Sequence, residues 1–419
     1  MHFQTQKKHR VMADLIDVIT YGPISTTSIV TSRRKHPLDP ILKSFLIFGI
    51  DIEEKEVTGN FTKILYKVWS VIVILFYHYY LISDLAWYIR RSAQENAIAE
   101  STSVWASIIT FDLLLLRKKQ LKKTVRFVYL ETMKLTEKER KRFEKIVVIV
   151  CCIVWVYVCI FVTQHGAFKH RESYGEFHTT TLLHMAYKKL NDPMRTIVAK
   201  FDKCMESFFI QGLMTLAMAL YLLLCLNARL WFKNFQEHFE NHECLKLDSN
   251  ALDIRYFTSS YEILAKNVHI LDDGFSQIVA SWLLMILVTL CVRIISVLNP
   301  VTVTTNQMLT VIILTFARAI TTLIGTSFIG DSVYNESLTA ISLLFKLRRT
   351  DSMVWKSTNF YEIQLALTRY SFNPTQLTVW KFARLNRGFL MTCLGMMTTY
   401  IIIAIQLYPN AMKGLESLS

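Results

Sequence analysis

The sequence is poor in charged residues, glycine and proline. Charged residues occupy 19% of the 419 positions, whereas ordinary soluble proteins carry about 25%. Only 12 glycines and 7 prolines are present, and no Ser/Gly-rich linker, internal repeat or low-complexity tract divides the chain. With 52% hydrophobic residues, the composition argues against a soluble enzyme and predicts one integral membrane domain over residues 1–419.

Patterns for disulfides, metals and a cleaved leader are also missing. The eight cysteines show no paired spacing, and most lie in apolar runs, where a reduced thiol behaves as a small hydrophobe. The apolar run that should follow Lys7, Lys8 and Arg10 in a signal peptide is broken by Asp14 and Asp17. We therefore expect no disulfide framework, no metal, no cofactor and no cleaved signal.

Long apolar runs are the main positive feature. A helix rises about 1.5 Å per residue, so about 20 apolar residues cross a hydrocarbon core of about 30 Å. The sequence predicts an all-α integral membrane protein with seven transmembrane helices, at 64–87, 97–116, 146–164, 207–228, 274–298, 306–330 and 388–408. Asp112 interrupts the second of these runs and Arg318 the sixth. The intervening segments 117–145, 229–273 and 331–387 are predicted to be cytoplasmic helical extensions.

The distribution of Lys and Arg predicts the orientation. A cytoplasmic N-terminus places 34 of the 47 basic residues inside and 10 outside, with three in spans, and cytoplasmic loops hold the excess. The C-terminus is then extracellular. The net charge of +14 lies beside the inner leaflet, where it contacts membrane lipid, so a nucleic-acid partner is not needed to explain it. The sequons at Asn60 and Asn335 become cytoplasmic and are expected to carry no glycan.

The last predicted helix contains polar residues that need an explanation. Residues 388–412 include no charge, yet Thr399, Tyr400 and Gln406 carry polar atoms that are costly in lipid without a partner or water. Seven residues turn a helix by about 700°, which places Thr399 and Gln406 within about 20° of one face. Ile402 or Ile403 interrupts this face. Such a stripe suits a water-filled pore with a hydrophobic constriction, or hydrogen bonding between helices.

This segment resembles the signature of insect gustatory receptors. Thr399-Tyr400, five apolar residues and Gln406 match the family pattern Thr-Tyr, five hydrophobics, Gln, although Leu407 replaces the usual Phe. The preceding stretch 380–386 is also similar to the family, which often has Gly where this chain has Trp380. The resemblance implies a ligand-gated cation channel of four subunits around a pore lined by the last helix. Odorant receptors share the architecture without this pattern, so the gustatory type is preferred.

The resemblance also assigns roles within the last helix. Gln406 is expected to present amide dipoles near the gate, Ile402 or Ile403 to seal it, and Thr399 to present a hydroxyl. Tyr400 lies about 100° from this stripe and is expected to pack against a neighbouring helix. Sugar-receptor members tend to have an acidic residue among the five hydrophobics, and residues 401–405 contain none. A sugar ligand is therefore disfavoured.

The ligand pocket is expected among the outer halves of the membrane helices, built from aromatic and a few polar side chains. The candidates are Trp155, Tyr157, Phe208, Gln211, Arg293, Gln307 and Thr310, each of which has core packing or interfacial anchoring as its alternative. Charges inside spans usually face a cavity or a partner. An ion pair between Asp112 and Arg318 is predicted on that ground, with ligand sensing by Arg318 as the alternative.

Other functions fit the sequence less well. A seven-helix G-protein-coupled receptor requires the opposite orientation, and Tyr does not complete an Asn-Pro-x-x-Tyr pattern after Asn299 or Asn373. A transporter should show repeated halves, and an enzyme should show clustered intramembrane catalytic residues. We therefore expect a non-enzymatic receptor in the cell membrane of a sensory neuron. Its partners are a small-molecule ligand and further receptor subunits, in a homo- or heterotetramer. Bitter compounds, pheromones, carbon dioxide and nutrients all remain open as ligands.

Overall fold

The computed structural model describes residues 36–52, 60–91, 95–167, 191–241, 251–298, 306–350, 357–372 and 374–407. The chain divides into two compact units, Met1–His36 and Pro37–Ser419. Every element described below belongs to the second unit.

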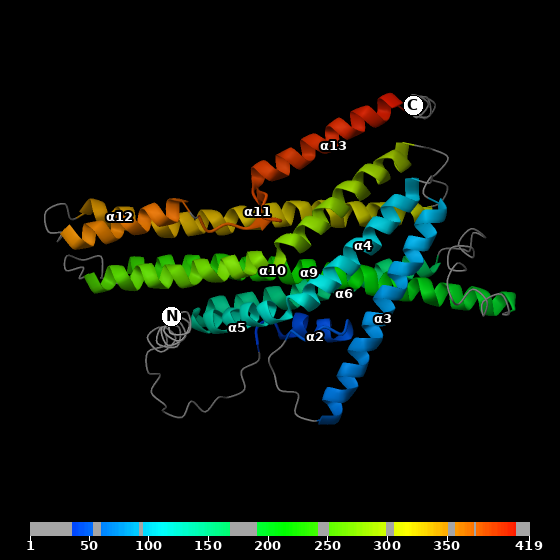
Figure 1. The fold of residues 1–419 in the computed structure, drawn as a ribbon, viewed down its shortest axis with the longest axis horizontal. Coiled ribbons are helices and arrows are strands. Elements are labelled where there is room, and N and C mark those ends of the chain that lie inside the picture. Colours follow the sequence, from blue (N-terminus) through cyan, green and yellow to red (C-terminus); the bar gives the residue numbers. More distant parts are fainter. Residues whose placement is uncertain are drawn as a thin grey trace, which may run out of the picture. The chain divides into compact units, whose positions relative to one another are not determined.

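The described residues are almost entirely helical (Figure 1). The longer helices are α3 (Asn60–Arg91), α4 (Glu95–Leu116), α6 (Glu137–Ala167), α9 (Asp192–Asn241), α10 (Ala251–Leu298), α11 (Asn306–Thr350) and α13 (Arg387–Leu407). Shorter elements are α2 (Asp39–Ile47), α5 (Lys118–Lys134), α12 (Ser357–Phe372) and the two-residue strands β1 (Thr378–Val379) and β2 (Ala383–Arg384). Five helices, α3, α6, α9, α10 and α11, are long and apolar enough to cross a membrane, and α4 and α13 contain shorter apolar segments. Among the described residues, the five long apolar helices and the two shorter ones make up the seven that were predicted, and the all-α membrane fold is confirmed.

Helix α9 lies at the centre of the bundle. In its most apolar stretch 78% of the residues are buried, against 22% in α3 and 28% in α6. The exposed side chains of α3 and α6 are large and apolar, for example Ile64, Leu75, Ile153 and Val156. Such surfaces are stable only against lipid or another subunit. Helices α3 and α6 therefore form the periphery, while α9 contacts α4, α5, α6, α10 and α11.

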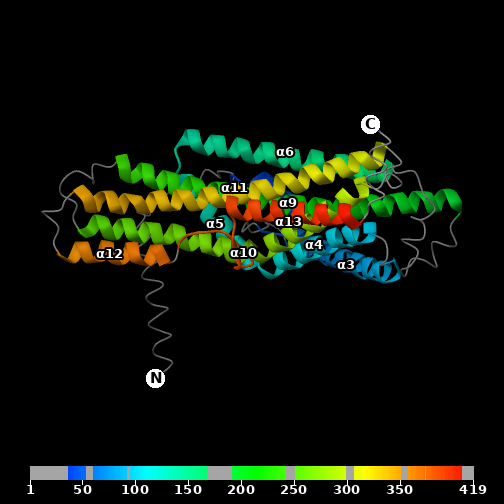
Figure 2. The same cartoon turned by 90° about the horizontal axis from the view of Figure 1, so that it is seen from above.

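The 50 residues of α9 correspond to about 75 Å of helix, far more than the hydrocarbon thickness. Figures 1 and 2 show one half of α9, α10 and α11 bundled with α12, at the end of the molecule away from α3. With the orientation predicted from the basic residues, this half would lie on the cytoplasmic side.

The segment before the first span forms an unpredicted helix, α2, that packs against α6 and α9. Pro40 stands in its first turn, where the missing N–H costs nothing. Its side chains Ile41 and Phe45 are fully buried, as is the following Phe48. A Cβ built on Gly212 of α9 would lie 2.8 Å from Cζ of Phe48. Glycine at position 212 therefore makes room for the Phe48 ring.

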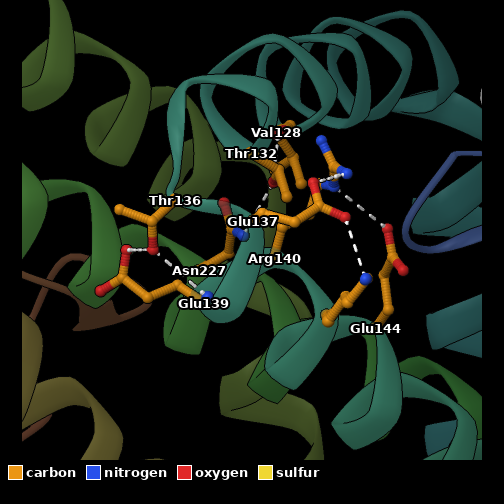
Figure 3. Close-up of polar contacts among 9 residues, drawn as sticks. Val128, Thr132, Thr136, Glu137, Glu139, Arg140, Glu144 and Asn227 are labelled. Carbon is orange, nitrogen blue, oxygen red and sulfur yellow. Dashed lines mark hydrogen bonds and ion pairs between the residues drawn. The ribbon is translucent and has the colours of Figure 1, made fainter.

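Helices α5 and α6 meet at a capped turn (Figure 3). Thr136 precedes α6, and its Oγ1 lies 3.3 Å from the amide nitrogen of Glu139 and 2.8 Å from Glu139 Oε2. The Thr136 hydroxyl thus accepts from the Glu139 amide, as an N-cap side chain does, and donates to the Glu139 carboxylate. Asn227 of α9 donates a 3.1 Å bond to Thr132 Oγ1, which fastens the end of α5 to the central helix. The predicted extension 117–145 is therefore two helices with a turn between them.

The predicted helical extension 331–387 contains a short strand pair as well as helix. Helix α12 ends at Phe372, and β1 pairs antiparallel with β2, with Thr378 opposite Arg384 and Val379 opposite Ala383. Pro374 disfavours helical backbone at the residue before it. Trp380 and Lys381 have φ values of 48° and 64°, in the left-handed region. We call residues 377–386, which join α12 to α13, the hairpin.

Candidate functional site

Helix α13 packs against the bundle along only one face. It contacts α10 and α11, and its buried side chains are Leu390 and Cys393, with Met397 partly buried against the core. Figure 1 shows it rising from the hairpin, at the edge of the bundle. At about 100° per residue, Leu390 and Met397 lie about 160–180° from Thr399. The predicted stripe is thus on the side of the helix opposite the packed face.

The residues of this stripe are exposed. Thr399 and Gln406 are exposed, and the exposed fractions of Ile402 and Ile403 are 51% and 47%. A Cβ on Gly395 would meet nothing within 4 Å. The Thr399 hydroxyl donates a 3.0 Å bond to the carbonyl oxygen of Gly395 in its own helix. Threonine can therefore face an open space here without an unsatisfied donor, and Tyr400 lies on the flank with 40% of its surface exposed.

The hairpin fastens the start of α13 to α10. Asp272 of α10, almost fully buried, accepts bonds from the amide of Thr378 at 2.6 Å and from its hydroxyl at 2.8 Å. The same carboxylate pairs with Lys381, which also lies 2.7 Å from Asp273. Burial lowers the pKa of Lys381, but its hydrogen bonds and charge interactions with the two aspartates outweigh this effect and raise the pKa above its ordinary value. The lysine is therefore held as a cation.

The other side of the hairpin is fastened to α11. Arg387 Nε lies 3.2 Å from Asp331 Oδ2, and the Arg384 guanidinium lies 3.0 Å from the centre of the Tyr334 ring, a cation–π contact. A Cβ on Gly330 would lie 2.8 Å from both the Cβ and the carbonyl oxygen of Leu385. Helix α11 and the hairpin therefore touch through backbone, so they cannot shift independently without losing this contact.

The capping of α13 completes the attachment. Asn386 Oδ1 accepts a 2.7 Å bond from the amide of Phe389, as an N-cap residue does. The amide of Trp380 donates a 3.0 Å bond to the carbonyl oxygen of Ser276. Trp380 has a left-handed backbone, a conformation that glycine adopts without steric cost.

Two of the predicted pocket residues come together around Phe48. The Phe48 ring stacks on Phe208 and Trp155, with centroid distances of 5.6 and 6.5 Å. The indole Nε1 of Trp155 donates a 3.0 Å bond to Ser44 Oγ of α2. Tyr157 stands on the same helix as Trp155, and its buried hydroxyl makes no hydrogen bond to any described residue. Helix α2 thus closes an aromatic cluster, formed by Phe48, Trp155 and Phe208, against α6 and α9.

Gln211 belongs to a separate polar group that crosses α9. Its Nε2 donates a 2.9 Å bond to Ser103 Oγ of α4, and its Oε1 accepts a bond from Arg318 Nη1 of α11. The predicted ion pair between Asp112 and Arg318 is wrong, because within the described residues Arg318 pairs with the neutral amide of Gln211. The Nε of Arg318 is buried without an acceptor there. Sequence position gives the depth of a residue in the membrane but not the direction in which its helix face points.

The remaining pocket candidates cannot be placed in a site. Arg293 lies in α10, and Gln307 and Thr310 lie in α11, but their side chains fall outside the described residues. Among the functional residues missed by sequence reasoning, Asp272 and Asp331 gave a usable signal. Each is an acidic residue at the predicted inner end of a span, on the same predicted side of the membrane as the basic stretch 381–387.

Comparison with known proteins establishes the fold. No family model matches the sequence, and no curated protein matches it significantly. The insect olfactory receptor OR5 from Machilis hrabei matches in structure with a TM-score of 0.66 and 14% identity, over 88% of this chain and 97% of that one. The same receptor in complex with eugenol matches with a TM-score of 0.67 and 15% identity, over the same shares of the two chains.

The chain therefore has the seven-helix fold of an insect olfactory receptor. It is a multi-pass membrane protein of chemoreceptor fold.

Proposed function

We propose that this chain is a gustatory receptor subunit, a ligand-gated cation channel of the cell membrane whose last helix lines a pore shared by four subunits. The observation that carries the proposal is the position of the Thr399–Gln406 stripe, opposite the packed face of α13. The Gln406 amide at the end of this stripe would be costly on a lipid-facing surface. The same stripe facing a water-filled axis needs no compensation.

Both flanks of the stripe support a ring of subunits. Met396 and Tyr400 lie on one flank, and Met391 and Leu394 lie on the other, each 40–66% exposed. In a cyclic assembly each copy covers one flank of its neighbour with the opposite flank. The apolar flanks would then be buried, leaving the stripe to face the axis.

The attachment of the hairpin suggests how a ligand would act on the pore. A ligand bound among the outer halves of the helices would shift α10 or α11, and the hairpin would pass that shift to the start of α13. The aromatic cluster around Phe48, with Trp155 and Phe208, is one candidate contact surface for the ligand, and Tyr157 offers a hydroxyl that bonds to no described residue. The Thr-Tyr to Gln motif favours a gustatory over an olfactory assignment, while the fold accommodates both. A sensory neuron is the expected cell type.

Recording from cells that express the chain tests the proposal. The chain is expressed alone and with related subunits, and currents are measured during a tastant panel while GDP-β-S blocks G-protein signalling. Channel current is expected to persist under this block. Loss of every response in GDP-β-S, with the protein present at the surface, would favour a G-protein-coupled receptor.

A matched pair of substitutions tests the pore. Gln406→Glu is expected to raise the permeability of Ca²⁺ relative to Na⁺, because a ring of carboxylates attracts divalent cations. Gln364→Glu makes the same chemical change at an exposed position of α12 and should leave permeability unchanged. Equal permeability ratios in Gln406→Glu and the wild type would remove Gln406 from the conduction path.

A further inference from the structure

Arg318 carries a charge that the described protein does not neutralise. It lies within the apolar part of α11 that can cross a membrane, where an ionised side chain is costly unless it meets a partner or water. Its one hydrogen bond among the described residues goes to the uncharged Oε1 of Gln211, and no described carboxylate forms an ion pair with it. The site therefore holds a net positive charge.

The geometry of the guanidinium indicates which chemistry can neutralise it. Nη1 is occupied by Gln211, whereas Nε is buried and lacks an acceptor among the described residues. The edge formed by Nε and Nη2 is therefore the one left for a ligand. Two parallel N–H groups on this edge match the two oxygens of a carboxylate, which binds Arg in the same plane.

Gln211 and Ser103 hold this group in place. Gln211 is itself fixed by the 2.9 Å bond from its Nε2 to Ser103 Oγ, so its Oε1 is turned toward Arg318. The side chains of Ser103, Gln211 and Arg318 are all half-buried, while the Nε atom of Arg318 is buried. The group is thus preorganised, and its remaining N–H donors belong to the positively charged guanidinium of Arg318.

We propose that Ser103, Gln211 and Arg318 form an anion-binding site for the carboxylate of a small organic acid. This assignment rests on the proposed receptor function, since it names the chemical class of the ligand. Arg318 would form the bidentate contact, while Gln211 and Ser103 would position the guanidinium. Any apolar part of the ligand would lie against the surrounding membrane helices.

A binding measurement tests the site without relying on channel current. Purified full-length protein is placed in nanodiscs of zwitterionic lipid, and thermal stability is followed at constant ionic strength with hexanoate, hexanol or hexanamide. Hexanoate is expected to raise the melting temperature in a saturable way, and the two neutral analogues are not. Equal effects of all three probes would overturn the proposal.

Substitution at Gln211 provides a variant that should still fold. Gln211→Glu places a carboxylate on Arg318 within the protein, so it is expected to raise thermal stability and to weaken hexanoate binding at least about tenfold, the loss expected for one charge-assisted contact. The control is Gln277→Glu, because Gln277 Oε1 also accepts a bond from an arginine, Arg117, at 2.7 Å. This control should bind hexanoate as the wild type does. Unchanged hexanoate affinity in Gln211→Glu would refute the site.

Two further arms separate the sources of an anion. Arg318→Lys keeps the charge but removes the fork, so hexanoate binding should weaken, whereas chloride titration should give no saturable effect in either protein. Nanodiscs that contain phosphatidylglycerol should leave hexanoate affinity unchanged within about twofold at matched ionic strength. If phosphatidylglycerol abolishes hexanoate binding, the site belongs to a lipid headgroup and the proposal fails. Because no arm uses current, a failed channel would leave these results interpretable.

Discussion

Lys381 and Asp272 form an ion pair in which the aspartate side chain is 2% exposed and the lysine side chain is 49% exposed. The buried partner also accepts both hydrogen bonds from Thr378. One carboxylate of α10 therefore binds the hairpin at three points. We therefore expect Asp272 to contribute more to the stability of the attachment than the exposed Asp273 beside it.

Asp272→Asn is expected to loosen the hairpin. It removes the charge from the acceptor of the two buried hydrogen bonds from Thr378, and hydrogen bonds to a charged group contribute about 1.5–3 kcal/mol. Lys381 is half-exposed and keeps Asp273 as a partner, so its lost ion pair adds little. Asp273→Asn removes only an exposed ion pair, worth less than about 1 kcal/mol. Thermal stability of the two purified variants, measured by size-exclusion after heating, should differ in this order. Equal losses would show that Asp272 has no special role.

Trp380→Gly is expected to be more stable than Trp380→Ala. Both variants remove the same side chain, which is 53% exposed, but only glycine relieves the positive φ, at a gain of about 1 kcal/mol. The difference between the two melting curves therefore isolates the backbone. If alanine is equal or better, position 380 is not strained in the protein.

Gly330→Ala is expected to push the hairpin away from α11, because the added Cβ meets the backbone of Leu385 at 2.8 Å. We expect a loss of about 1–3 kcal/mol and a weakened response to ligand. On the same helix, Gly325→Ala meets only Leu222 at 3.7 Å and should stabilise the helix by about 0.5–1 kcal/mol. The contrast fails if both variants behave alike in melting and current assays.

Neither native sequon is expected to carry a glycan, because both are predicted to lie in the cytoplasm. Ser337 of the second sequon is also buried. His178→Asn creates the sequon Asn-Thr-Thr with Thr179 and Thr180, in a connection predicted to be extracellular. Treatment with peptide-N-glycosidase F should change the electrophoretic mobility of His178→Asn and leave that of the wild type unchanged. A glycan at Asn60 or Asn335 would reverse the orientation.

Cysteine substitutions in α13 should divide by face. Thr399→Cys and Gln406→Cys are expected to lose current on exposure to a charged methanethiosulfonate reagent, because their side chains would face the water-filled axis. Met397→Cys and Ile401→Cys, on the packed side, should retain most of it. The wild type, which contains the buried Cys393, shows how much current is lost by reaction of the native cysteines. Block confined to positions 397 and 401 would contradict the pore assignment.

The long membrane helices were predictable because an apolar run of this length has few alternatives in water or lipid. Helix α2 has only nine residues and so escapes a search for spans, although Asp39-Pro40 and the apolar spacing at Leu38, Ile41 and Phe45 mark it. The hairpin carries no Gly or Asn at its left-handed positions, so its turn gives no local signal.

Contacts within the candidate sites were harder to predict than the helices themselves. Gln211 and Arg318 were each singled out by residue type, but 107 positions separate them, and their pairing depends on which faces of α9 and α11 meet. Asp112 was predicted as the partner of Arg318 for the same reason, because the sequence does not show which helix faces meet. The exposed stripe of α13, by contrast, follows from helical periodicity alone.

Helix α11 joins the proposed anion site directly to the hairpin. Arg318 and Asp331 stand thirteen residues apart on one uninterrupted helix, which is about 20 Å. A rigid rod of that length converts a small tilt at the first residue into a lateral displacement at the second, where the hairpin is fastened. Under the proposed function, substitutions near Arg318 would change ligand preference while the attachment of the hairpin at Asp331 stays unaltered.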